Sequence, residues 1–428
     1  MNLLGWRGVQ DAGSTVDDAT RAQIDRVFRE EFGRVVSVLI RLVGDFELAE
    51  DLVGEAFARA MEEWPQKGVP ERPGAWLTTV ARRRGLDRLR HQKMARSKGE
   101  QLRSEDASEH EHIDEQVGYP DERLRLIFTC CHPALSAEAQ VGLTLRTLGG
   151  LETGEIARAF LLPEATLAQR LVRAKKKIRV ANIPYEVPAP SHQRERLDAV
   201  LRVVYLIFNE GYQASAGELM RADLCEEAIR LGELLVELMP DEPEVRGLCA
   251  LMLFHHSRRD TRLDAEGDLV VLEEQERSRW DRASIARGQA QLDVAMAYSR
   301  GGPYQVQAAI AALHAQAPSA EATDWPQILM LYQGLLRWQE SPVVRLNAVV
   351  ALAMVEGPER GLEALARLED DGRLEDYHPL WVAKADLLRR AGRRGEAVDA
   401  YDEALRHVGN DAQRRFLQRR RDACAEAE

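Results

Sequence analysis

The sequence predicts an all-α protein, and three observations lead to that prediction. Ala, Leu, Arg and Glu are abundant among the 428 residues and aromatic residues make up only 6%, a composition that suits helices better than sheets. Apolar residues recur every three or four positions through most of the chain, which is the spacing of one helix face. Gly and Pro gather between such stretches, where helices end. For this length we expect two to four helical domains.

The sequence argues against several classes of protein. There is no run of about 18 apolar residues that could span a membrane, and the first residues, MNLLGWRGVQDAG, lack the apolar segment of a secretory signal. Five cysteines in so long a chain do not make a disulfide framework, which fits a reducing cytoplasm. No Ser-His-Asp, P-loop or dinucleotide signature is present. We therefore expect a cytoplasmic protein that is not an enzyme, with no catalytic residue, no cofactor, no metal and no membrane partner.

Charge is distributed unevenly along the chain. Residues 72–98 hold nine basic residues against one acid, residues 99–122 hold nine acids against one Arg, and residues 164–179 are again basic. Residues 190–428 carry a net charge of about −11, close to the −12 of the whole chain. The acidic net charge is thus a poor guide to nucleic-acid binding, because it conceals two basic segments.

Residues 20–95 are expected to form three helices after a mobile leader at 1–19. The first runs from about Arg21 to Val43, and Asp45 caps the second after a break at Gly44-Asp45. The second helix has an apolar stripe from Leu48 to Trp64, and its other face shows Glu50, Asp51, Glu55 and Arg59. Residues 65–73, with a proline at each end, are predicted to be a loop.

The third helix starts apolar and ends basic. Trp76, Leu77, Val80 and Ala81 share one face, whereas Leu86 and Leu89 fall on nearly the opposite side at about 100° per residue. One apolar stripe therefore does not run the length of the helix. Either the helix meets two neighbours or it bends near Gly85.

Residues 121–182 are expected to form four short helices, after an acidic flexible linker at 96–120. The last two are separated by the turn at 160–163. The final helix has an apolar stripe, made of Leu167, Leu171, Ala174 and Ile178, beside basic residues. Two short helices joined by a tight turn, the second one basic on its outer face, are typical of a helix-turn-helix.

Residues 183–190 contain three prolines and are predicted to separate a C-terminal domain, 190–428, that is helical almost to its end. A weak repeat fits the 34-residue tetratricopeptide (TPR) pattern. The positions that fit are Trp381, Ala385, Leu388, Gly392, Ala397, Tyr401 and Ala404, with a looser helix pair from about Arg345 to Leu368. Small residues there would let paired helices approach closely.

This order of parts resembles the extracytoplasmic-function (ECF) sigma factors of bacterial RNA polymerase. The motifs are DLVGEAF (51–57), AWLTTVARRRGLDRLR (75–90) and LRTLGGLETGEIARAFLLPEATLAQRLVRAKKKIR (145–179). The first two look like sigma region 2, here 20–95, and the third like sigma region 4, here 121–182. The helical tail resembles the TPR-like extension of one subgroup of that family.

The resemblance implies roles for residues of region 2. The helix with Asp51 and Glu55 would dock on the β′ clamp helices of core polymerase. The loop at 64–73 would capture a flipped non-template base of the −10 element. The residues implied to contact −10 DNA are Arg82, Arg83, Arg84 and Arg88. A captured base and its exposed strand need a stacking surface and cations, which arginines supply.

The resemblance also implies that the second helix of the helix-turn-helix reads the −35 element in the major groove, while the polymerase β flap is a further partner. Thr166, Gln169, Arg170 and Arg173 lie opposite Leu167 and Leu171. Arg can bind guanine and Gln adenine through two hydrogen bonds. Lys175, Lys176 and Lys177 are assigned to phosphates, which position the protein without specifying sequence. The turn lacks the usual glycine and the usual Ser or Thr cap, so the start of this helix stays open.

Four further segments have functional and structural interpretations. Cys130-Cys131-His132 suggests metal or redox sensing, but adjacent cysteines are poor partners for one tetrahedral ion, so we favour buried thiols. The acids around Gly267 do not match a calcium loop and indicate a turn. Residues 208–212 and 273–281, dense in polar and aromatic groups, are expected to be packed or solvated faces, with a regulatory pocket or partner surface as the alternative.

The first functional hypothesis is a sigma factor that binds core polymerase, recognises −35 and −10 DNA and helps to melt it. Its C-terminal domain would regulate this by folding over the basic surfaces or by binding a regulatory protein or ligand. The alternative is an autonomous helix-turn-helix regulator with a TPR sensor, and a third possibility is a pure scaffold. Transcription that depends on added core polymerase separates the first from the other two.

Overall fold

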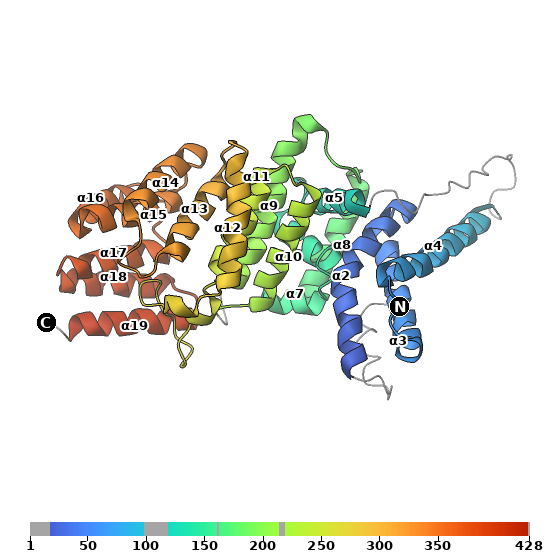
Figure 1. Ribbon diagram of the computed structural model, residues 1–428, viewed down its shortest axis with the longest axis horizontal. Coiled ribbons are helices and arrows are strands. Elements are labelled where there is room, and N and C mark those ends of the chain that lie inside the picture. Colours follow the sequence, from blue (N-terminus) through green and yellow to red (C-terminus); the bar gives the residue numbers. More distant parts are fainter. Residues whose placement is uncertain (1–17, 98–118, 161, 214–218, 427–428) are drawn as a thin grey trace. The chain divides into compact units, whose positions relative to one another are not determined.

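The computed structural model describes residues 18–97, 119–160, 162–213 and 219–426 (Figure 1). Most of the expected leader, 1–19, and of the expected linker, 96–120, lies outside these ranges. Within them the regular structure is helical, apart from one isolated bridge between Leu263 and Leu269. The all-α prediction is confirmed. None of the helices in these ranges has the length and apolar character needed to cross a bilayer.

The chain divides into two compact units, Met1–Val203 and Val204–Glu428. The division falls inside helix α9, Pro190–Tyr212. The sequence placed its domain boundary earlier, at 183–190, where the prolines lie. The first half of α9 belongs with the N-terminal unit because its side chains contact that unit: the Arg196 guanidinium donates a hydrogen bond to the Phe128 carbonyl oxygen, 2.5 Å away.

Three helices form the first part of the N-terminal unit: α2 (Asp18–Val43), α3 (Phe46–Lys67) and α4 (Pro73–Ser97). Each of them packs on the other two. The Asp45 carboxylate caps α3 by accepting hydrogen bonds from the backbone N–H groups of Glu47 and Leu48. Phe32 on α2, Phe57 on α3 and Leu77 on α4 are fully buried.

The prediction of a loop at 65–73 is wrong for residues 65–67, which are helical. Helix α3 continues through Pro65 and ends at Lys67, so the connection to α4 is only 68–72. Pro65 cannot donate a backbone hydrogen bond, but its fixed φ is compatible with a helix. Gly68 ends the helix with φ of 80°, a conformation that favours glycine, and its N–H group binds the Trp64 carbonyl oxygen.

The apolar residues of α4 change sides along the helix because the helix packs on two partners, α2 and α3. Helix α4 is continuous through Gly85 and contacts both α2 and α3. Gly85 is buried, and a Cβ placed on it would lie 3.2 Å from Leu52 Cδ1 and 3.6 Å from Leu42 Cδ2. The glycine thus allows α4 to approach α2 and α3 together.

Four helices follow, α5 (Tyr119–Cys130), α6 (Ala137–Thr147), α7 (Thr153–Ala159) and α8 (Glu164–Val180), close to the expected ranges. Glu152 and Glu155 form a reciprocal capping box at the start of α7. Helix α8 begins directly after Pro163, without a side-chain cap, and packs on both α6 and α7. This fixes the start of the helix that the sequence left open, and the pair α7–α8 has the helix-turn-helix arrangement.

The C-terminal unit is a series of helices in which each packs on the next (Figure 1). After α9 these are α10 (Ala222–Leu238), α11 (Pro243–His256), α12 (Arg282–Ala297), α13 (Pro303–Gln316), α14 (Trp325–Trp338), α15 (Pro342–Glu356), α16 (Pro358–Glu369), α17 (His378–Arg390), α18 (Arg394–His407) and α19 (Asp411–Ala425). The alanines at 385, 397 and 404 and Tyr401 are buried together between α17 and α18. That pair occupies the positions that fitted the TPR pattern; the repeat assignment itself stays a prediction.

Candidate nucleic-acid and polymerase interfaces

Helix α8 presents a polar outer face, because Leu167, Leu171, Ala174 and Ile178 are buried on its other side. Three of the residues expected to meet DNA, Gln169, Arg173 and Lys176, are exposed on this face. Thr166 and Arg170 lie at its margin and are half-buried. The outer face therefore offers amide and guanidinium donors together with a lysine, which suits base edges and phosphates.

The other two lysines of the expected phosphate-binding group point elsewhere. The Lys175 ammonium lies 2.9 Å from a carboxylate oxygen of Glu50 on α3. The Lys177 ammonium donates to the Ala134 carbonyl oxygen, in the turn before α6. Lys175 is therefore half-buried, whereas Lys177 is as exposed as Lys176 but directs its ammonium group to that carbonyl oxygen.

Glu50 is the residue that sequence reasoning misplaced. It was expected on the polar face of α3, but it is only 6% exposed. Helices α6 and α8 cover it: Lys175 Nζ of α8 lies 2.9 Å and Arg146 Nε of α6 3.9 Å from the same carboxylate oxygen. The local pattern could not reveal this, because the cations come from helices about 100 residues further along the chain.

The contact between these two helical groups includes further polar pairs around a hollow. Arg41 on α2 binds Glu122 on α5 at 2.7 Å, and the hydroxyl of Tyr185 donates toward the carbonyl oxygens of Ser37 and Glu122. Burial, with the Glu122 carboxylate nearby, raises the pKa of Tyr185.

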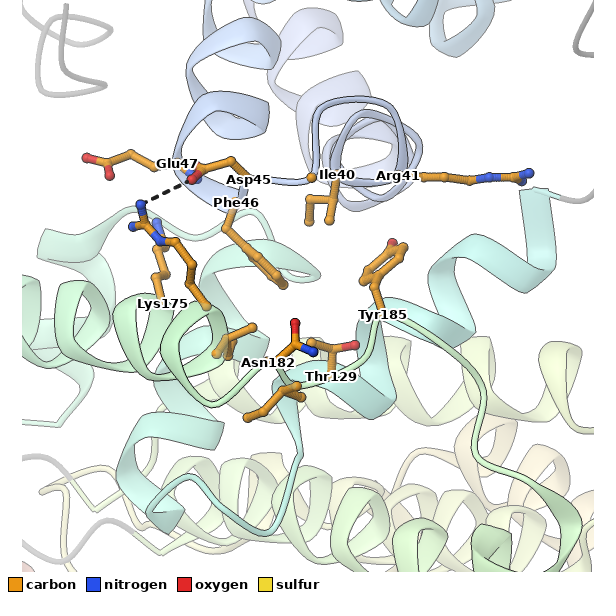
Figure 2. A pocket seen from close by; sticks show the side chains of 13 residues that line it. Ile40, Arg41, Asp45, Phe46, Glu47, Thr129, Lys175, Asn182 and Tyr185 are labelled. Atoms are coloured by element: carbon orange, nitrogen blue, oxygen red, sulfur yellow. Dashed lines mark hydrogen bonds and ion pairs between the residues drawn. The ribbon is translucent and has the colours of Figure 1, made fainter. Parts of the chain in front are cut away.

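The hollow has a volume of about 390 Å³, and Figure 2 shows Ile40, Asp45 and Phe46 on the blue helices above it with Lys175, Thr129, Asn182 and Tyr185 on the green segments below. Polar pairs thus hold this contact together with apolar packing, in which Phe28 and Phe32 of α2 lie against Gly150.

The residues assigned to −10 DNA lie on α4 beside one of those assigned to polymerase. Glu55 on α3 receives Arg84 at 2.6 Å and Arg88 at 2.8 Å, one guanidinium on each carboxylate oxygen. Arg83 is exposed and Arg82 is half-buried, as is Asp51. The structure therefore brings Glu55 together with two of the four arginines, a pairing that the sequence did not indicate.

Two tryptophans pack where α3 ends and α4 begins. The Trp64 and Trp76 rings meet edge to face, with centroids 5.4 Å apart. Trp64 is 2% exposed and belongs to the core, whereas Trp76 is half-buried beside the 68–72 connection. Of the two rings, only Trp76 offers surface to a base held in that connection.

The Cys130 and Cys131 thiols are buried, 3.2 Å from the Thr147 hydroxyl and 3.5 Å from the Thr144 hydroxyl. Burial raises the pKa of Cys130, and that of Cys131 to about 12, so both stay protonated and unreactive at neutral pH. Within the described ranges no group of three or more His, Cys, Asp or Glu side chains is arranged to hold a metal ion.

The two polar and aromatic segments of the C-terminal domain both pack against residues 258–262, where Arg258 lies 5.9 Å from the ring centroids of Tyr212 and Trp280. Arg262 lies over the Tyr212 ring at 3.6 Å from its centroid, and Arg277 lies over Trp280 at 4.8 Å. Trp280 Nε1 donates to the Thr261 hydroxyl at 3.0 Å. These contacts indicate packing by buried cations on aromatic rings. Around Gly267 the Asp264 carboxylate accepts from the N–H groups of residues 266 and 268, which makes the expected turn.

Comparison with known proteins matches three parts of the chain to protein families. Residues 27–94 match Sigma-70 region 2, residues 125–178 match Sigma-70 region 4, and residues 196–296 match a family of unknown function, DUF6596. No solved structure matches the chain at a significant level.

Three relatives show how far the similarity extends. "Uncharacterized protein R00370" of Rhizobium meliloti is 45% identical over 92% of this chain and 93% of its own length. "ECF RNA polymerase sigma factor SigL" of Mycobacterium tuberculosis is 30% identical over 38% of this chain and 90% of its own length. "Probable ECF RNA polymerase sigma factor SigI" of the same species is 26% identical over 40% of this chain and 59% of its own length. With both sigma regions matched and the helical domain following them, the chain belongs to the ECF sigma factors of RNA polymerase and carries a helical C-terminal extension.

Proposed function

We propose that this protein is a cytoplasmic promoter-specificity subunit of RNA polymerase, which binds core enzyme, recognises −35 and −10 DNA and promotes melting. It has no catalytic step of its own. The observation that carries the proposal is the pairing of two cationic helices: α4, with its arginines at 82–84 and 88, and α8, with Gln169, Arg173 and Lys176 exposed. A helix-turn-helix alone would explain only the second of them.

Melting is assigned to region 2. Unstacking a base costs a few kcal/mol, so the opened strand must be held by stacking and by cations. Trp76 and the exposed Arg83 lie on one helix, less than two turns apart along α4. Asp51 and Glu55 on α3 are the acids available to a basic surface of polymerase, which we take to be the β′ clamp helices, with the β flap receiving region 4.

Reading both elements at once requires regions 2 and 4 to separate. The two elements lie roughly 25 base pairs apart by their designations, on the order of 85 Å at 3.4 Å per base pair. Here α3 and α8 are in direct contact through Glu50 and Lys175. We therefore infer that the contact of regions 2 and 4 belongs to the protein before it engages a promoter.

The C-terminal domain is proposed to regulate initiation. Its net charge of about −11 is opposite in sign to the two DNA-binding helices. An acidic domain of this kind can suppress binding of the unengaged protein to DNA, or it can receive a regulatory protein or ligand.

The decisive test is run-off transcription by purified core polymerase, with and without the full chain, on candidate promoters. Initiation that requires both core enzyme and this protein supports the proposal. Tight binding to an operator without polymerase would instead favour the autonomous regulator with a sensor domain.

The regulatory role is tested by a truncation that ends after Val203, which keeps Arg196 on the Phe128 carbonyl oxygen. Unchanged promoter-dependent transcription and unchanged DNA affinity of this shorter chain would refute regulation by the C-terminal domain.

A further inference from the structure

One apolar side chain stands in the middle of the outer face of α8. Val172 is 62% exposed, three residues after Gln169 and four before Lys176. At helical spacing these three residues are neighbours on one surface, and Arg173 adjoins them. Val172 therefore lies among the side chains that face the major groove in the proposed function.

Val172 contributes little to the fold of the region. The apolar residues that bind α8 to its neighbours, Leu167, Leu171, Ala174 and Ile178, are on the other side of the helix. Valine is also a weaker helix former than the Arg, Lys or Gln found around it. Single exposed apolar residues are common on protein surfaces, so the significance of Val172 comes from its place between groups suited to bases.

The major groove offers one apolar group to an apolar side chain. Each base pair shows a pattern of hydrogen-bond donors and acceptors there, and thymine adds its C5 methyl group. A valine on a reading helix gains no hydrogen bond from any base, but it can remove that methyl group from water. We propose that Val172 is a specificity-determining residue that selects a thymine in the −35 element by contact with its methyl group. This inference rests on the proposed function of α8.

The position of that thymine is limited by the neighbouring residues. Arg173 and Gln169 suit guanine and adenine, each through two hydrogen bonds. Adjacent residues on a helix are separated by 1.5 Å along its axis, less than the 3.4 Å between base pairs. The thymine selected by Val172 is therefore expected within about two base pairs of the purine that Arg173 contacts.

The chain provides a matched control on the same helix. Val180 is 75% exposed and is the last residue of α8, eight residues beyond Val172 and thus about 12 Å further along the axis. In helix-turn-helix proteins the N-terminal part of the reading helix contacts base edges. Val180→Ala removes the same two methyl groups as Val172→Ala, but outside the reading part.

The experiment uses full-length protein with core polymerase and a promoter that the wild-type holoenzyme selects from a library randomised in the −35 element. Each −35 thymine is replaced in turn by deoxyuridine, which lacks only the C5 methyl group. Binding is measured by competition and initiation by run-off. For wild type and for Val180→Ala we expect one position at which uracil weakens binding about fourfold, the effect of one buried methyl group.

Val172→Ala should weaken binding to the thymine promoter. The variant protein should then bind the promoter with uracil at that position as tightly as it binds the thymine promoter. The proposal is overturned if Val172→Ala keeps the wild-type preference for thymine at every position, or if wild type shows none. A failure of core-dependent initiation by wild type would instead refute the proposed function itself, and the reading role with it.

Discussion

At the scale of single residues, Glu55 links the two functions assigned to region 2. Its carboxylate holds Arg84 and Arg88, so it reduces the positive charge that α4 offers to a DNA strand. A basic polymerase surface that binds Glu55 would release both arginines. The same carboxylate can thus neutralise the DNA-binding surface in the unbound protein and serve as a docking group in the complex.

We expect Glu55→Gln to bind single-stranded −10 DNA more tightly than wild type when polymerase is absent. Each arginine that contacts a phosphate of a single strand adds about 0.7 to the magnitude of the slope of log K against log salt concentration. The two released arginines should therefore increase that magnitude by up to about 1.4. Stability should change by no more than about 1 kcal/mol per pair, because these ion pairs are partly exposed. Fluorescence anisotropy over a salt series measures the slope.

Glu62→Gln is the matched control, since Glu62 is an exposed acid on the same helix. It removes one negative charge without releasing Arg84 or Arg88. Equal slopes for the two variants would show that Glu55 exerts only a general charge effect.

Gly85 shows how one missing side chain positions a whole helix. A Cβ at this site would touch Leu52 at 3.2 Å, a contact tighter than is usual but made by the end of a flexible side chain. Gly85→Ala should be nearly neutral, because the gain in helix propensity of up to about 1 kcal/mol offsets the crowding. Gly85→Leu should lower the free energy of unfolding by about 1–3 kcal/mol through overpacking. Urea denaturation measures both, and a stable Gly85→Leu protein would contradict the proposed three-helix contact.

At the scale of elements, much of the fold could be predicted from the sequence because each helix has its own periodicity. Helices α5 to α8 lie close to their expected ranges. The change of apolar face along α4 also has a cause in the structure, because α4 packs on both α2 and α3. The error at Pro65 arose because proline normally ends a helix, yet its fixed φ is tolerated in the last turn of α3.

The site was less predictable than the fold, for a physical reason. Exposure of Gln169 and Arg173 follows from the buried stripe of α8, a local property. The partners of Lys175 and Glu50 follow from a contact between α3 and α8, which are separated by about 100 residues. Periodicity places a residue on a helix face, but it cannot say whether another helix will cover that face.

The contact between α3 and α8 should depend on Glu50. Glu50→Gln leaves Lys175 and Arg146 without their carboxylate, and removing one partner of a buried ion pair typically costs about 3–5 kcal/mol. We expect that loss to appear as separation of regions 2 and 4. Spin labels at Glu62→Cys and Val180→Cys report the distance, since all five native cysteines are buried.

Glu47→Gln is the control for this change, because Glu47 is exposed and borders the same hollow. It should leave the distance distribution as in the parent protein. If Glu50→Gln also leaves it unchanged, the apolar contacts alone hold the two regions together.

At the scale of the whole molecule, the C-terminal unit should lose stability in acid. The interior of the C-terminal domain contains histidines beside buried arginines. Desolvation lowers the pKa of His314 to about 4, with a further contribution from Arg258 and Arg277, and burial lowers the pKa of His255 well below its usual value. Both rings are therefore neutral in the folded domain at neutral pH.

A histidine whose pKa is lowered by folding makes stability fall as the pH falls. The unfolded chain binds a proton at His314 near pH 6.5, whereas the folded domain does not bind it until about pH 4. Stability contributed by neutral His314 is thus complete above about pH 6.5 and is lost progressively between pH 6.5 and 4. Because the ring is only half-buried, we expect a loss of about 1–3 kcal/mol over this range.

His314→Gln should flatten this part of the pH profile, since the amide cannot titrate, while His192→Gln, at an exposed histidine of the N-terminal unit, should leave it unchanged. Urea unfolding of the full chain between pH 7.5 and 4.5, followed by circular dichroism and tryptophan fluorescence, measures the effect. Trp325, which packs edge to face on the His314 ring with centroids 5.3 Å apart, contributes to the emission. A pH profile of His314→Gln as steep as that of wild type would show that the acid sensitivity comes from other groups, with His255 the first to examine.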